Sequence, residues 1–111
     1  MESGLPSPIP EEAGELLDQV LAPLLQDFEE SFARGLVLVQ HCPERVMDSP
    51  SRERFRQRLE QASAQLAAAR ALRAAAPEPM ALDMDLIRPW HELVVEVWRL
   101  SAALRAVGIH P

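Results

Sequence analysis

Leu16 to Val39 read LLDQVLAPLLQDFEESFARGLVLV, and the apolar residues in this stretch recur every three or four positions. The repeating set is Leu17, Leu21, Leu24, Phe28, Phe32 or Gly35, and Val39. This spacing places them on one face of a helix, which we expect to run from Glu11 to about Gln40. Pro23 lies inside the pattern, where a proline removes a hydrogen bond and clashes with the preceding turn. We therefore expect either a kink at residues 19–23 or two helices in sequence.

A second helix is predicted after a connector at residues 41–49. Ser49 is a suitable N-cap, and Pro50 fits the first helical position because its missing N–H would have no partner there. The core-facing positions again step by three and four, at Phe55, Leu59, Ala62, Leu66, Ala69 and Leu72 or Arg73. The second half is rich in alanine, whose small side chain lets a neighbouring helix come close. We expect this helix to end at about Ala76, before Pro77 and Pro79.

A third helix is predicted to begin at Pro89 and to stop at Gly108, with Pro111 just beyond. Its apolar positions are Trp90, Leu93 or Val94, Val97, Leu100 or Ser101, and Leu104. Three long helices with short connectors predict an all-α fold, an antiparallel bundle of three helices, or of four if the first is split at Pro23. Residues 11–108 then form one domain. Residues 1–10 hold three prolines and are predicted to form a flexible arm.

The composition narrows the classes of function. The chain has 111 residues, with 17 acids, 11 bases and a net charge of −6, which argues against nucleic acid as a partner. Ten acids and two arginines lie in residues 1–48, whereas two acids and six arginines lie in residues 49–76. The first two helices would therefore attract each other as neighbours. The longest apolar run, residues 36–39, is too short to cross a membrane, and a single cysteine without a signal peptide favours the cytoplasm.

Two blocks of sequence carry a resemblance to a known family. One is the leucine and phenylalanine pattern of residues 16–35, and the more specific one is Pro-Trp-His-x-Leu-Val-x-Glu-x-Trp at residues 89–98. Over about Leu16 to Arg105 the chain resembles a family of small cyanobacterial proteins of unknown function. The resemblance implies a helical protein that is cytoplasmic or faces the thylakoid, and it leaves room for peripheral contact with that membrane. It brings no activity, catalytic residue or cofactor with it.

His91, Glu92 and Glu96 form the group that most resembles a chemical site. The two glutamates are four residues apart and share a helix face, so they could share an ion. A zinc protease motif, however, needs a second histidine where Val95 stands. We therefore predict no metal and no cofactor, and we interpret His91 as a capping or hydrogen-bonding residue in the first turn of its helix.

His41 and Cys42 are a second candidate, as a metal pair, a catalytic dyad or a point of pigment attachment. Adjacent residues rarely converge on one substrate, and the sequence marks no third residue that would orient them. We therefore interpret Cys42 as a half-buried residue of the connector and expect no catalysis.

The densest basic stretch holds four arginines at Arg52, Arg54, Arg56 and Arg58. A surface for nucleic acid would interleave them with aromatic residues, but Phe55 alone is present and its spacing assigns it to the core. We expect these arginines to form a solvated face that pairs with acids of the first helix.

Trp90 and Trp98 are eight residues apart and close to the same helix face. We favour core positions for both indoles, although an uncovered tryptophan beside Arg99 would suit an interface. We predict a non-enzymatic interaction module that binds another protein, a second copy of itself, or both. The candidate interface residues, part of core and contact surface together, are Phe28, Phe32, Trp90, His91, Val94 and Trp98.

The resemblance suggests an assembly or regulatory role near the photosynthetic or carbon-fixing machinery. Two alternatives remain open. One is a small carrier of a cofactor or pigment that uses His91, Cys42 or the space between helices. The other is an enzyme with His91 and Glu96 as an acid–base pair.

Overall fold

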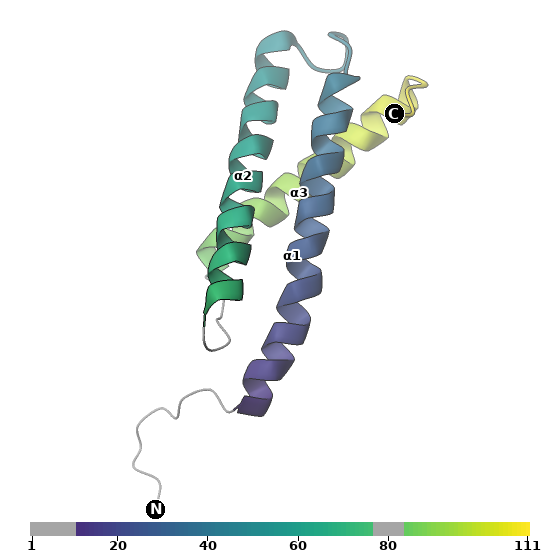
Figure 1. Cartoon of the computed structure of the whole chain (residues 1–111). Coiled ribbons are helices and arrows are strands. Elements are labelled where there is room, and N and C mark those ends of the chain that lie inside the picture. Colours follow the sequence, from purple (N-terminus) through teal and green to yellow (C-terminus); the bar gives the residue numbers. More distant parts are fainter. Residues whose placement is uncertain (1–10, 77–83) are drawn as a thin grey trace, which may run out of the picture.

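The fold is a bundle of three α-helices. The computed structural model describes residues 11–76 and 84–111, in which α1 spans Glu11–Gln40, α2 spans Ser49–Ala75 and α3 spans Met84–Ala106. α1 and α2 lie side by side and antiparallel, and α3 crosses them diagonally (Figure 1). α1 packs against both of the other helices. The prediction of an all-α bundle is confirmed, and the predicted arm at residues 1–10 lies outside the described residues.

α1 continues through Pro23 as one helix, so the alternative of two helices in sequence is wrong. Pro23 is exposed, whereas Leu25 and Phe28 are buried. The proline costs one backbone hydrogen bond on the solvent side. The buried residues that follow hold the helix against its neighbours, because tertiary packing supplies most of the stability of a helix in a protein.

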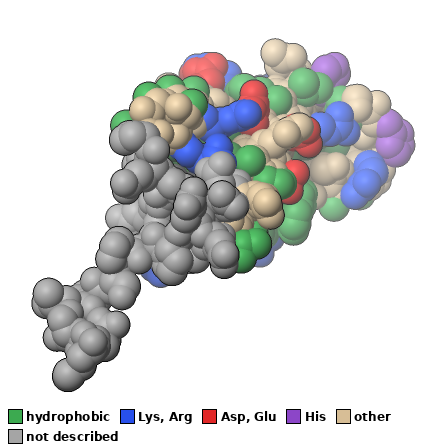
Figure 2. Space-filling model, turned by 60° about the horizontal axis from the view of Figure 1, so that its bottom comes forward, with side chains coloured by type: hydrophobic (Ala, Val, Ile, Leu, Met, Phe, Trp, Pro, Cys, Tyr) green, Lys and Arg blue, Asp and Glu red, His purple; other side chains and the backbone are tan. Residues whose placement is uncertain are grey.

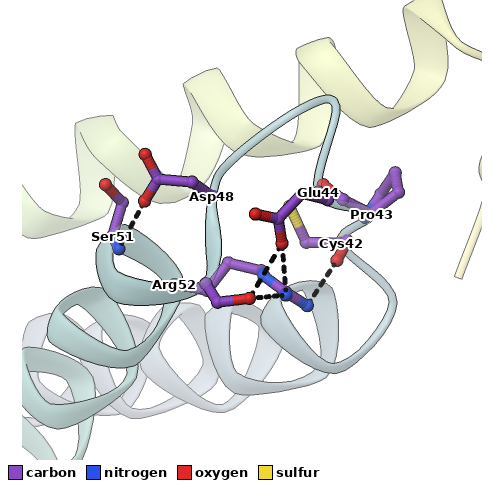
Figure 3. A network of polar contacts seen from close by, with 7 residues as sticks. Cys42, Pro43, Glu44, Asp48, Ser51 and Arg52 are labelled. Carbon is purple, nitrogen blue, oxygen red and sulfur yellow. Dashed lines mark hydrogen bonds and ion pairs between the residues drawn. The ribbon is translucent and has the colours of Figure 1, made fainter.

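α2 begins at Ser49, one residue earlier than predicted. The N-cap is Asp48 and not Ser49, and the Asp48 carboxylate accepts a hydrogen bond from the backbone N–H of Ser51 at 2.8 Å (Figure 3). This bond is the main reason why the pKa of the Asp48 carboxyl lies below its usual range. Pro50 lies in the first turn, where its missing N–H leaves no gap in the hydrogen bonding.

α3 begins at Met84, so the predicted start at Pro89 is wrong and this proline lies inside the helix. Leu86 and Ile87 are partly buried against the core, and their burial stabilises the helical turn before the proline. His91 consequently lies well inside α3. The prediction that it occupies the first turn is also wrong.

The end of α3 confirms the predicted stop. Gly108 has a φ of +81°, a backbone conformation that glycine adopts easily. Its N–H donates to the Arg105 carbonyl at 3.0 Å, and the N–H of Ile109 donates to the Leu104 carbonyl at 2.9 Å. These two bonds form a Schellman motif, and Ile109 packs against the core.

One core runs through the bundle. Its buried members are Leu25, Phe28, Phe32, Leu38, Val39, Cys42, Phe55, Leu59, Ala62, Leu66, Trp90, Leu93, Val94, Val97, Leu100 and Leu104. Gly35 lies where the three helices meet: a Cβ atom there would be 2.8 Å from Cγ2 of Val97 in α3 and 3.0 Å from both Cδ atoms of Leu59 in α2. A residue without a side chain therefore lets α1 contact both partners at one level. Within residues 11–76 and 84–111, no helix combines the length and apolarity that crossing a membrane requires.

Candidate interaction surfaces

Trp90 is a core residue, as predicted. Its side chain is 1% exposed, and its indole N–H donates to Oε1 of Gln65 in α2 at 3.2 Å. Its ring meets Phe28 of α1 edge to face, with the centroids 5.6 Å apart, and Phe28 stacks with Phe32 at 6.0 Å. Trp90 thus joins all three helices, and its partly polar ring has the hydrogen bond that burial demands.

Trp98 is not a core residue, so the favoured interpretation of this indole is wrong. It is 61% exposed, although Val94 and Val97 beside it are buried. Eight residues along a helix correspond to a rotation of about 80° from the starting residue. That offset carries Trp98 off the buried stripe that Trp90 begins.

The six candidate interface residues separate into two groups. Phe28, Phe32, Trp90 and Val94 are buried inside the bundle. His91 and Trp98 are exposed, and they lie seven residues apart on α3. The prediction of an interface therefore stays with these two. We define the Trp98 face as the stripe of α3 that contains them at spacings of three and four: His91, Val95, Trp98, Ala102 and Arg105.

Glu96 does not pair with His91. Its carboxylate binds the guanidinium of Arg58 in α2 with two hydrogen bonds, at 3.0 and 2.5 Å, and this contact raises the pKa of Arg58. Five residues along α3 turn Glu96 about 140° away from His91, so the two cannot share a proton within one site. Among the described residues, no three side chains of His, Cys, Asp or Glu gather as metal ligands.

His41 and Cys42 also face different surroundings. His41 is exposed, and its Nδ1 lies 2.9 Å from the Val37 carbonyl. Cys42 is buried rather than half-buried, and burial raises the pKa of its thiol. A protonated, covered thiol is a poor nucleophile and a poor metal ligand. This geometry suits neither a catalytic dyad nor pigment attachment.

Arg52 fastens the connector between α1 and α2. Its guanidinium donates to the Cys42 carbonyl at 3.0 Å, to Glu44 at 3.1 Å and to the Ser49 hydroxyl at 2.7 Å (Figure 3). The contact with Glu44 is also an ion pair. Arg52 therefore has a structural role at the turn of the α-hairpin.

Among the side chains that the structure describes, none of the other arginines of the basic stretch pairs with an acid of α1, so that prediction is wrong. Arg56 pairs with Glu53 and Glu60 of its own helix, because acids three or four residues away are the nearest partners. Among the described residues, the ion pair that links α1 to α2 is formed by Arg70 and Glu29. Arginine and acidic side chains interleave over the surface seen in Figure 2.

A groove of about 500 Å³ lies between the start of α2 and the end of α3. Its apolar part comes from Val46, Met47, Phe55, Leu100 and Ala103, and its charged part from Arg54, Arg58, Glu96 and Arg99. Sequence reasoning missed this feature, because its two walls are far apart in the chain and no local pattern brings them together.

Residues 11–106 match the family described as a protein of unknown function, DUF2605. The chain belongs to the DUF2605 family. The matched range covers all of α1, α2 and α3 with both connectors. DUF2605 carries no assigned activity, which confirms the expected relation to an uncharacterised family. No curated protein and no solved structure is similar enough to the chain to count as a match.

Proposed function

We propose that this DUF2605 protein is a non-enzymatic protein–protein interaction module. The exposed indole of Trp98 carries the proposal. Burying an indole ring is strongly favourable in free energy, and the exposed ring of Trp98 lacks this stabilisation. Tryptophan is also among the residues most enriched in the positions that dominate binding energy at interfaces. Arg105, on the same stripe of α3, adds a side chain of the type that such interfaces favour.

The Trp98 face has the spacing that receives a helix. Its members step by four and three residues along α3, which is the pattern of a coiled-coil seam. Trp98 lies in the centre of this stripe, with small or half-buried residues on the turns beside it. A partner helix laid along α3 would cover the indole and leave the polar ends of the face, His91 and Arg105, at the rim.

By association with the cyanobacterial resemblance, we place the protein in the cytoplasm, in an assembly or regulatory role near the photosynthetic or carbon-fixing machinery. Peripheral contact with the thylakoid membrane is compatible with this role. Because DUF2605 itself is without an assigned function, the partner has to be identified by experiment.

The decisive experiment is a tagged pull-down from cyanobacterial lysate, with soluble and membrane fractions kept separate. Three baits are compared: wild type, Trp98→Ala and Leu72→Ala. Leu72 is also an exposed apolar residue, but it lies on α2 and serves as the matched control. We expect one protein to be retained by the wild type and by Leu72→Ala, and to be lost from a folded Trp98→Ala. Equal retention by all three baits would refute a role for Trp98.

A small cofactor or pigment carrier is the alternative function, and the groove between α2 and α3 is the observation that favours it. Its volume is within the range of small-molecule sites. Neither His91 nor Cys42 lines it, so such a ligand would be held without the residues first considered for it. A visible absorption band or a stoichiometric metal in protein purified from its native host would support the carrier.

A further inference from the structure

The walls of the groove have the form of a receptor for a helix. α2 contributes Ser51, Arg54, Phe55 and Arg58, and α3 contributes Glu96, Arg99, Leu100 and Ala103. Each set steps by three, one and three residues, so each is one stripe about two turns long. The connector closes one end with Val46 and Met47, and the bidentate pair of Arg58 and Glu96 joins the two helices at the other.

The groove also specifies the charge of its occupant. Arg54 donates to the Ser51 hydroxyl, and neither Arg54 nor Arg99 forms an ion pair with any residue that the structure describes. The lining therefore holds three arginines against the one carboxylate of Glu96, in a chain whose net charge is −6. An occupant with carboxylates beside apolar side chains would complement both the charged part and the apolar part of the lining.

The first ten residues of α1 have this chemistry. Residues 11–20 read EEAGELLDQV, with four acids and no base. They extend past the end of α2 (Figure 1), and Leu16 and Val20 are 62% and 64% exposed. These two apolar residues are four apart and so lie on one face. Ten helical residues span about 15 Å, enough to fill a groove with walls of about 11 Å.

We propose that this protein associates head to tail, with residues 11–20 of one copy lying in the groove between α2 and α3 of the next copy. The inference deepens the proposed interaction function by naming a second copy as one partner. A chain cannot fill its own groove, because the groove lies beside the end of α1 and residues 11–20 are its beginning, a separation of about 30 Å or more along the helix. The contact joins two different surfaces and therefore builds rings or filaments.

The test uses two complementary variants in sedimentation velocity experiments. Arg54→Glu with Arg99→Glu inactivates the groove and leaves residues 11–20 intact, whereas Leu16→Ser with Val20→Ser does the reverse. We expect wild-type mass to rise with concentration, and each double variant alone to associate on the order of tenfold or more weakly. An equimolar mixture of the two should form a dimer and stop there, because one working groove meets one working helix.

Three controls keep the outcome clear. Circular dichroism must show both variants folded, which their exposed positions favour. Arg105→Glu, a charge reversal on α3 outside the groove, should leave self-association unchanged. Trp98→Ala should do so as well, so that loss of a foreign partner and loss of self-association are separate results. A wild type that stays monomeric at every concentration, or a mixture that forms no dimer, would overturn the inference and leave the proposed role of Trp98 untouched.

Discussion

Trp90 and Trp98 belong to the same helix, yet one is 1% exposed and the other 61%. Trp90 has a neighbour on each side: Phe28 of α1 meets its ring and Gln65 of α2 accepts from its N–H. Two turns later, Val97 still touches α1 at Gly35, but Trp98 itself lies outside this contact. A helix in a three-helix bundle therefore buries only a narrow stripe of its surface. A large apolar residue beside that stripe is left for some other contact.

Trp90→Ala should have the largest effect on stability. We expect the free energy of unfolding to fall by about 3–5 kcal/mol, because the indole is fully buried and its removal leaves a cavity between three helices. Urea denaturation followed by circular dichroism would measure the loss. Leu72→Ala, at an exposed apolar position, is the control and should cost little. A loss below about 1 kcal/mol for Trp90→Ala would contradict its central role.

Gly35→Ala tests how tightly α3 packs at the level of Trp98. The new Cβ would approach Cγ2 of Val97 to 2.8 Å, and valine in a helix has little freedom to move aside. We expect a net loss of about 1–2 kcal/mol, since the strain of overpacking outweighs the better helix propensity of alanine. In a Val97→Ala background the same change should become neutral or stabilising. If Gly35→Ala is more stable than the wild type, this result would contradict the close approach of the helices at Gly35.

Gln65→Ala separates the polar contribution of Trp90 from its packing. The change removes the acceptor of the indole N–H and leaves the ring in place. We expect a loss of about 1 kcal/mol, the usual net value of one hydrogen bond. Gln61→Ala, one turn earlier on the same helix and also exposed, provides the matched control. Equal stability of the two variants would show that water replaces Gln65 at no cost.

Trp98→Ala should have the smallest effect on stability, within about 0.5 kcal/mol, because an exposed side chain contributes little to folding. Thermal and urea unfolding of the monomer would measure it. A loss comparable with that of Trp90→Ala would place Trp98 in the core and remove the basis of the proposed function.

Fluorescence gives an independent control for this last prediction. In Trp98→Phe the remaining Trp90 should be protected from iodide quenching. In Trp90→Phe the remaining Trp98 should be quenched readily.

The sequence was sufficient to predict the helices whose apolar residues recur with a helical period. The spacing from Leu21 to Val39 predicted α1, and Gly108 predicted the end of α3. The start of α3 was missed because Pro89 is also tolerated inside a helix when Leu86 and Ile87 before it are partly buried against the core. The proline pattern alone could not reveal that burial.

The candidate surfaces were harder to predict, because they depend on which helices meet. Spacing assigned Trp98 to a helix face but could not show that no neighbour covers it. Arg58 and Glu96 are 38 residues apart, and only the crossing of α2 and α3 brings them together. The groove that they close is a product of tertiary structure, and local sequence carries no signal for it.

Cys42 gives this protein a built-in probe of its own local opening. The thiol is the single one in the chain and is covered at the turn between α1 and α2, where Arg52 holds the backbone. Any reagent that modifies it must wait until this end of the bundle opens. The rate of thiol labelling therefore reports the free energy of opening at the hairpin turn, without an introduced label and without unfolding the rest of the chain.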